Sequence, residues 1–252
     1  MYPLWLDAEA TISNVKPALL NELSEKFGKR LGPEDVFAYC AGVMAHSAFT
    51  ERFARDLRRP GLRLPITSDV ALFDEASELG RRSLWLFSYG ERFTEPSTRP
   101  AGAPRMATNR PTIPDGGDMP GASEPLPNEI RYAAADNRLH IGRGFIDNVT
   151  PAMRNCDVSG MNVLDQWFSY RRLDRTRPVI GNDKRPPSPL MDIQPGHWLP
   201  EYTDDLIDLL NVLGLLTELE PEQADMLESI MKGPLFDLAD LAAEGAFAMP
   251  GE

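Results

Sequence analysis

One section of this chain has the hydrophobic period of strands between sections with the period of helices, and that section limits the folds open to the chain. Residues 130–134 and 139–141 alternate apolar and polar side chains, as half-buried strands do, and the Asp136-Asn137 pair between them is typical of a tight turn. On both sides of this section the apolar residues recur at helical spacing. We therefore predict an α+β protein with a helical N-terminal part, a small β-rich section and a helical C-terminal cap.

Capping residues and helix breakers set the expected limits of the helices. Either Ser68 or Asp69 suits an N-cap, Thr203 suits another, and Pro221 suits the first turn of a last helix. Together with the apolar spacing, these signals predict helices over residues 17–28, 33–46, 48–59, 69–85, 162–170, 203–219 and 221–232.

Changes in composition divide the sequence into four predicted ranges. Residues 94–128 are rich in Pro, Gly, Thr and Ala and lack periodicity, as a linker or a long surface loop does. We predict a helical N-terminal part at residues 1–93, this linker or loop at 94–128, a β-rich section at 129–200 and an acidic helical cap at 201–252.

Charge is distributed unevenly along the 252 residues, whose formal net charge is −12. Residues 190–252 hold fourteen acidic residues and one basic residue, whereas residues 131–185 hold ten basic residues and six acidic ones. A basic, aromatic-rich section of an acidic chain is where an anionic partner binds, and nucleic acid is the first candidate. Because the acidic C-terminal section repels DNA, we expect it to face away from any DNA-binding surface.

The sequence also bears on the compartment. It contains no apolar run long enough to span a bilayer, and its N-terminus lacks the basic start and apolar core of a signal peptide. Cys40 and Cys156 are the two cysteines and lie far apart, which argues against a disulfide framework or a cysteine-based metal site. We predict a protein of the reducing cytoplasm that has no membrane contact.

No set of residues predicts a catalytic, cofactor or metal site. Gly142-x-Gly144 is a fragment of a nucleotide-binding loop, and a bulge or a close backbone approach explains it better. The three histidines are scattered, and the acidic cluster at residues 204–208 is better explained as helix capping and a solvated face. We therefore predict no catalytic residue, cofactor or metal, and we do not expect the chain to be an enzyme by itself.

A cluster of arginines after an aromatic segment is the strongest candidate site. Guanidinium groups pair with phosphates in a forked geometry and read guanine edges, and neighbouring aromatic rings stack on bases. An equally good interpretation places Trp167 and Phe168 in the core and pairs the arginines with Asp165 and Asp174 on an ordinary surface. The candidate DNA-binding residues are Arg143, Arg154, Tyr170, Arg171, Arg172, Arg175, Arg177, Lys184 and Arg185.

A second basic run lies earlier in the chain, at residues 52–63. Its arginines have helical spacing and either grip a nucleic-acid backbone or solvate a helix, and we favour solvation. The run consists of Arg52, Arg55, Arg58, Arg59 and Arg63.

Five stretches are distinctive as a set. They read DVFAYCAGVMAHSAFTERFARDL, RLPITSDVALFDEASELGRRSLWLFSYGERF, LHIGRGFIDNVTPAMRNCDVSGMNVLDQWFSYR, SPLMDIQPGHW and TDDLIDLLNVLGLLTELEP. In this order they resemble the C-terminal specificity region of Type ISP restriction-modification enzymes, which are also adenine-specific DNA methyltransferases. The resemblance implies sequence-specific recognition of duplex DNA, while other domains of such enzymes bind S-adenosylmethionine and ATP.

The sequence lacks the catalytic motifs of those other domains. It has neither the Asn/Asp-Pro-Pro-aromatic tetrad of a methyltransferase nor a GxxxxGK[ST] phosphate loop. We therefore predict a DNA target-recognition module, with double-stranded DNA as its partner and base readout from loops near residues 142–185. One alternative is the specificity part of an adenine N6 methyltransferase that is active only with a methyltransferase or helicase subunit. The other is a protein-interaction relic that does not bind DNA.

Overall fold

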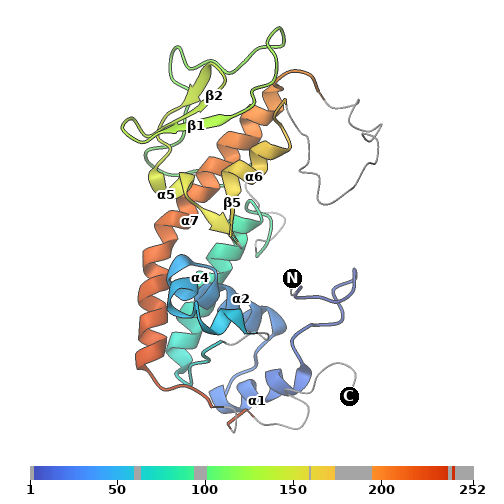
Figure 1. Ribbon diagram of the computed structural model, residues 1–252. Coiled ribbons are helices and arrows are strands. Elements are labelled where there is room, and N and C mark those ends of the chain that lie inside the picture. Colours follow the sequence, from blue (N-terminus) through green and yellow to red (C-terminus); the bar gives the residue numbers. More distant parts are fainter. Residues whose placement is uncertain are drawn as a thin grey trace, which may run out of the picture. The chain divides into compact units, whose positions relative to one another are not determined.

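A computed structural model describes residues 3–59, 64–93, 101–158, 160–173, 195–237 and 240–241 of the chain. It contains helices and two small antiparallel sheets, so the predicted α+β class is confirmed (Figure 1). The chain divides by its contacts into two compact units. The helical unit consists of residues 1–101 and 218–252, and the sheet unit consists of residues 102–217.

Four helices and a 3₁₀ turn come from the N-terminal part of the helical unit's described residues. They are α1 (Pro17–Phe27), α2 (Pro33–Met44), α3 (Ser47–Arg52), η1 (Asp56–Arg58) and α4 (Val70–Phe87). The predicted break is confirmed, because His46 has extended backbone angles and α3 restarts at Ser47. Asp69 is the N-cap of α4, and its carboxylate accepts hydrogen bonds from two backbone N–H groups of the first turn.

Helices α2 and α4 cross at two glycines. A Cβ atom on Gly42 would overlap the carbonyl oxygen of Ala76, and a Cβ atom on Gly80 would overlap that of Ala38. Glycine at both positions therefore lets the two backbones approach closely. The buried residues of this unit's core include Leu23, Phe27, Val36, Tyr39, Val43, Phe49, Phe73, Leu227 and Ile230.

In the sheet unit, β1 (Ile130–Ala133), β2 (Arg138–Ile141) and β3 (Gly144–Ile146) form an antiparallel sheet in that order. The predicted turn between β1 and β2 is confirmed, because Asn137 has a φ of 49° and Asp136 N–H donates to Ala133 O at 3.2 Å. Alternation then gives the sheet one inner face. That face carries Ile130, Tyr132, Leu139, Ile141 and Ile146, which all belong to the core of this unit.

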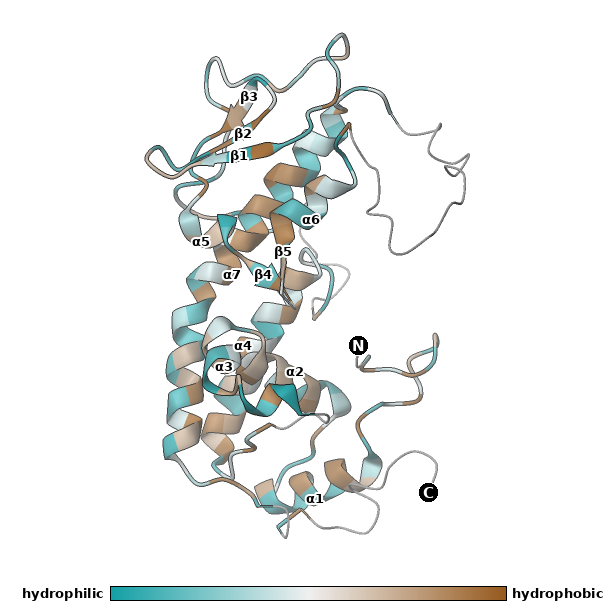
Figure 2. Ribbon diagram, in the orientation of Figure 1, coloured by the Kyte–Doolittle hydropathy of each residue, from teal (hydrophilic) through white to brown (hydrophobic). Residues whose placement is uncertain are grey.

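Helix α7 (Pro200–Lys232) supplies the other wall of this core. Figure 2 shows hydrophobic residues along its first part, beside the strands and α6 (Val163–Ser169). The sheet unit is completed by α5 (Pro151–Arg154), β4 (Asp157–Val158) and β5 (Met161–Asn162). Leu164 and Phe168 of α6 are buried with Leu206 and Leu210 of α7, so the predicted helix at 162–170 is confirmed as an amphipathic core helix.

Two predictions about α7 were wrong. Thr203 does not cap the helix, since α7 begins at Pro200 and the Thr203 hydroxyl accepts a hydrogen bond from Trp198 Nε1 at 2.9 Å. Pro221 does not start a new helix, because it lies inside α7. A proline inside a helix costs about 3 kcal/mol, and packing on either side outweighs it. Leu219 is buried, and Gln223 donates to Gly42 O and Ser83 Oγ.

The residues of 102–128 pack on the sheet unit. Met106 and Leu126 are buried in its core, and Met106 N–H donates to Asn211 Oδ1 of α7 at 3.0 Å. Thr112 and Asp147 exchange two backbone hydrogen bonds, so this segment covers the free edge of β3. Periodicity does not reveal such packing, because the segment has no regular secondary structure of its own. No described helix has the length and apolarity needed to cross a bilayer.

Candidate nucleic-acid interface

The outer face of the three-stranded sheet carries a row of cationic and aromatic side chains. The register places Arg131 of β1 opposite His140 of β2, and His140 opposite Phe145 of β3. Directly opposed residues on neighbouring strands project from the same face, so these three side chains lie side by side. Arg131 is exposed, and it forms no ion pair with any residue that the structure describes.

Arg138 flanks this row but is already engaged. Its Nε donates to Asp147 Oδ1 at 2.6 Å and its Nη2 to Asp147 Oδ2 at 3.2 Å. Its guanidinium also lies 3.9 Å from the centroid of the Phe145 ring. Arg138 therefore ties β2 to the end of β3 and fixes the Phe145 ring, while Arg131 is the cation left available to a ligand.

His140 occupies the centre of the row. Its ring centroid lies 5.6 Å from that of Phe145. Partial burial, followed by the charges of Arg131 and Arg138, lowers the pKa of His140 below its usual value. The imidazole is therefore mainly neutral at pH 7 and has one donor and one acceptor nitrogen.

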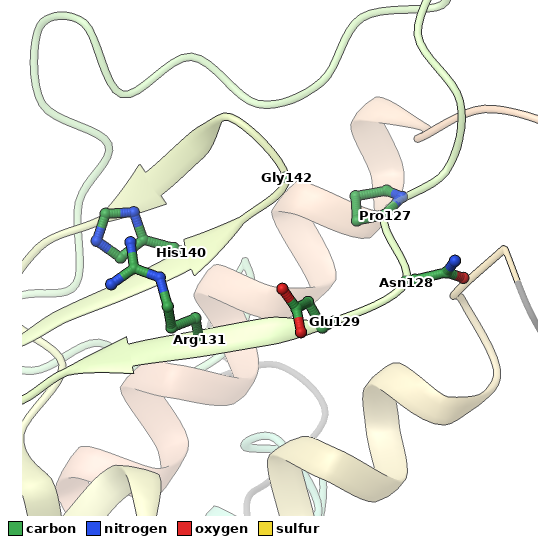
Figure 3. Close-up of a pocket in the computed structure, with 6 residues that line it drawn as sticks. All are labelled: Pro127, Asn128, Glu129, Arg131, His140 and Gly142. Carbon is green, nitrogen blue, oxygen red and sulfur yellow. The ribbon is translucent and has the colours of Figure 1, made fainter.

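A hollow of about 300 Å³ opens where β1 begins and β2 turns into β3. Figure 3 shows Arg131 and His140 close together on the same face, with Glu129 just before the start of β1. Within the described part of the chain, neither Glu129 nor Arg131 forms an ion pair, so the hollow presents a free carboxylate acceptor and a free guanidinium donor. Its lining residues are Pro127, Asn128, Glu129, Arg131, His140 and Gly142.

Backbone conformation or close packing requires glycine at two positions at this end of the sheet. Gly142 has a φ of 57°, which glycine adopts at no steric cost. A Cβ atom on Gly144 would lie 2.7 Å from Asp118 O, so the backbone of the preceding loop approaches β3 closely there. The predicted close backbone approach is confirmed. Between these glycines Arg143 has a side chain that is 59% exposed, and its Nε lies 2.9 Å from Glu124 Oε1.

Arg154 is held inside the fold of the sheet unit. Its Nη1 donates to Asn162 Oδ1 at 2.8 Å, and its Nη2 donates to Asp165 at 2.9 and 3.2 Å. Asn162 in turn caps α6, with its side-chain oxygen accepting from Asp165 N–H. The guanidinium of Arg154 therefore links the end of α5 to the start of α6.

Arg171 is the most engaged of the predicted residues. Its guanidinium lies 4.1 Å from the centroid of the Trp167 ring and 5.4 Å from that of Tyr202. Its Nη1 donates to Trp167 O at 3.0 Å, and its Nη2 contacts Asp205 Oδ2 at 3.4 Å. This site joins α6 to the acidic start of α7. As in the second interpretation of the cluster, the ring of Trp167 packs against the core and the arginine pairs with a carboxylate, although the partner is Asp205.

The remaining predicted residues are partly described. Tyr170 is 59% exposed, and its hydroxyl accepts a hydrogen bond from Gln166 Nε2 at 2.9 Å. Arg172 is half-buried. Arg175, Arg177, Lys184 and Arg185 lie outside the described residues. The sequence-predicted residues that are described therefore fall at separate places, namely the β2–β3 turn, the end of α5 and the end of α6.

Comparison with known proteins identifies the family. The model of the Type ISP C-terminal specificity domain matches residues 1–209. The chain belongs to this family. A search of curated proteins found no match to this specificity domain. Among solved structures it is similar to a chain of the DrdV–DNA complex, determined by cryo-electron microscopy, with a TM-score of 0.52 and 17% sequence identity. The match covers 86% of the specificity domain and 20% of that chain, so it spans about a fifth of the structural neighbour.

The candidates predicted from the sequence do not include the residues of the outer face. Arg131 was counted in the basic section and His140 among the scattered histidines, but neither was named as a candidate, whereas Arg143 was. The signal that finds them is the strand alternation itself. Once Leu139 and Ile141 are assigned to the core, Arg131 and His140 must lie on the opposite face.

Proposed function

We propose that this specificity domain recognises a duplex DNA target in a Type ISP restriction-modification or DNA-methylation system. The observation that carries the proposal is Arg131, which is exposed, has no ion-pair partner among the described residues, and lies side by side with His140 and Phe145 on the outer face of the sheet. Family membership supplies the context, since specificity domains are named for target selection. The structural neighbour was solved in complex with DNA. A cationic face with an aromatic ring has the composition that binds nucleic acid.

The hollow favours base readout over phosphate binding alone. A site that only held phosphates would be destabilised by a carboxylate beside its cation, yet Glu129 and Arg131 both line this hollow without pairing. Base edges present donors and acceptors together, and carboxylates accept from the amino group of cytosine while arginine donates to guanine. We therefore assign base contacts to Glu129, Arg131 and His140.

The phosphate contacts are assigned to cations that border this face. Arg143, on the β2–β3 turn, is exposed and exchanges its contact with Glu124 for a phosphate at little cost, because an exposed ion pair contributes about 0–1 kcal/mol. Tyr170 and Arg172 extend the proposed interface, whereas Arg154 and Arg171 support it through the fold. Arg175, Arg177, Lys184 and Arg185 complete the proposed set.

Selection from a random duplex library tests the base contacts. The full chain should enrich a defined sequence, and Arg131→Ala should lose preference at one base pair, with a loss of about 1–3 kcal/mol in binding to the enriched duplex. Glu129→Gln should relax preference at a neighbouring position. Failure of the wild-type chain to enrich any sequence at low salt would remove the proposal.

Arg82→Ala is a suitable control for that experiment. Arg82 is exposed and pairs with Glu222 at 2.7 Å in the helical unit, far in sequence from the outer face. Its loss removes the same charge, so it should lower affinity slightly while leaving the enriched sequence unchanged. Equal loss of preference in both variants would show that total charge, and not the hollow, sets selectivity.

We propose that catalysis comes from elsewhere. A methyltransferase or helicase subunit, or further domains, would supply S-adenosylmethionine- and ATP-dependent steps in the cytoplasm. Co-purification of such a subunit with the tagged chain tests this arrangement. Binding of S-adenosylmethionine by the isolated chain would contradict it.

A further inference from the structure

A short turn after α3 displays three arginines on the helical unit. Arg55, Arg58 and Arg59 are all exposed, and no residue in the described ranges forms an ion pair with any of them. We call residues 55–59 the arginine turn. Its one carboxylate is Asp56, so three positive charges face one negative charge within five residues.

The arginine turn is anchored to the core and has defined hydrogen bonds. Asp56 N–H and Leu57 N–H both donate to Phe53 O, at 2.9 and 3.0 Å, and Arg59 N–H donates to Asp56 O at 3.0 Å. The ring of Phe53 lies 4.8 Å from that of buried Phe49, which belongs to the core of the helical unit. The arginines are therefore presented from a fixed backbone, which lowers the entropy lost when they bind a ligand.

Most of this unit's other exposed cations on helices are paired. Lys26 contacts Glu22, Arg82 contacts Glu222, and Lys232 contacts Glu228. Lys232 lowers the pKa of the Glu228 carboxyl, and Arg52, just before the arginine turn, adds a smaller effect in the same direction. In a chain with a net charge of −12, adjacent arginines that have no ion-pair partner among the described residues stand out.

We propose that the arginine turn binds the phosphates of duplex DNA beside the recognition target, as a contact separate from the outer face of the sheet unit. This inference rests on the proposed function. Each guanidinium has five N–H donors in a forked geometry that matches phosphate oxygens. Leu57, which is 46% exposed between the arginines, provides an apolar contact for a deoxyribose. Such contacts position the protein without reading sequence.

The salt dependence of binding tests this inference. The full chain and a triple variant, Arg55→Gln with Arg58→Gln and Arg59→Gln, are titrated against a random-sequence duplex by fluorescence anisotropy. If three phosphates are contacted, the slope of log K against log salt should fall in magnitude by about 2.5–3, and Kd should rise at least about tenfold at moderate salt. Circular dichroism and thermal melting check that the variant is folded.

A matched triple variant separates a local site from total charge. Lys26→Gln, Arg82→Gln and Lys232→Gln together remove three charges that are each ion-paired in the helical unit. This control should change the slope much less than the arginine-turn variant, and replacing the three arginines by lysine should restore most of the slope. Equal slope changes in the two glutamine variants would overturn the inference.

The remaining outcomes are also distinct. A folded arginine-turn variant that binds duplex DNA like wild type overturns this inference and leaves the proposed function standing. A wild-type chain that binds no duplex at low salt removes both. Unchanged DNA binding with loss of a co-purifying protein subunit would make the arginine turn a protein-docking surface, which also overturns the inference.

Discussion

The sheet unit uses two of its arginines in opposite ways, and the sequence does not distinguish them. On the outer face, Arg131 is exposed and has no ion-pair partner among the described residues. At the end of α6, Arg171 lies over Trp167, donates to its carbonyl oxygen and contacts Asp205. The number of arginines in a stretch of sequence does not show which guanidinium groups have partners in the fold. A binding surface depends on the groups that have none. Stacked and hydrogen-bonded arginines stabilise the fold, and unpaired ones are available to a ligand.

Replacing Arg171 should have the largest effect on stability. Arg171→Ala removes two ring contacts and a charge-assisted hydrogen bond from a side chain that is 23% exposed, so it should lower the free energy of unfolding by about 2–4 kcal/mol. Arg131→Ala removes no described partner and should change stability by less than about 0.5 kcal/mol. Urea unfolding of both variants, monitored by tryptophan fluorescence, measures the difference.

The two variants should also differ in DNA binding, in the reverse order. At temperatures where both are folded, Arg131→Ala should lose more affinity for the enriched duplex than Arg171→Ala. Arg171→Lys keeps the charge but lacks the planar group that stacks on the rings, so it should recover only part of the stability. A stable Arg171→Ala variant that no longer binds DNA would reverse the comparison and return Arg171 to the interface.

Replacing Arg154 should have an intermediate effect on stability. Arg154→Ala should lower the free energy of unfolding by about 1–3 kcal/mol, because its side chain is only 20% exposed and it bonds both Asn162 and Asp165. Asn162→Ala removes the same contact together with the cap of α6. A double-mutant cycle should therefore give a clearly nonzero coupling energy between the two positions. Additive effects would mean that the bond contributes little to stability.

The helices and the strand pair could be predicted from the sequence because local signals determine them. Asp69 caps α4 through its own carboxylate, and Asn137 adopts the positive φ that its turn requires. The long α7 could not be predicted, because its continuity through Pro221 depends on the burial of Leu219 and on hydrogen bonds from Gln223 to Gly42 and Ser83, far away in sequence. Thr203 failed as a cap because Trp198 donates to its hydroxyl.

The candidate site was predicted less completely, for the same reason. Charge density points to residues 131–185, which contain the strands of the outer face, and the turn residue Arg143 was among the candidates. Whether a guanidinium is occupied depends on partners such as Asp205, which lies 34 residues beyond Arg171. Strand alternation contains the information that places Arg131 and His140 on one face, but it becomes usable only after the core face is known.

A smaller effect is expected from the buried histidine of the helical unit. His46 is 5% exposed, and burial lowers its pKa below the usual value. The unfolded chain therefore binds this proton more readily, so the stability that neutral His46 contributes is present above about pH 6.5 and decreases as the pH falls, by at most about 1.4 kcal/mol per pH unit. Urea unfolding between pH 7.5 and pH 5.5 should show a shallower pH dependence for His46→Gln than for wild type. Parallel curves would contradict this assignment.

The smallest predicted effect concerns His140, whose pKa should respond to bound DNA. On the free outer face, burial and the charges of Arg131 and Arg138 lower the pKa of His140, while Asp136 and Asp147 raise it. Bound DNA adds negative charge beside the ring, so its pKa should rise and the complex should take up part of a proton. Wild-type affinity should therefore increase as the pH falls from 8 to 6, and this increase should be about two- to fivefold larger than for His140→Gln, which cannot titrate. Anisotropy titrations at constant ionic strength measure the ratio. If the ratio of wild-type affinity to His140→Gln affinity did not change with pH, His140 would lie away from the DNA. The comparison between free and engaged groups would then depend on Arg131 alone.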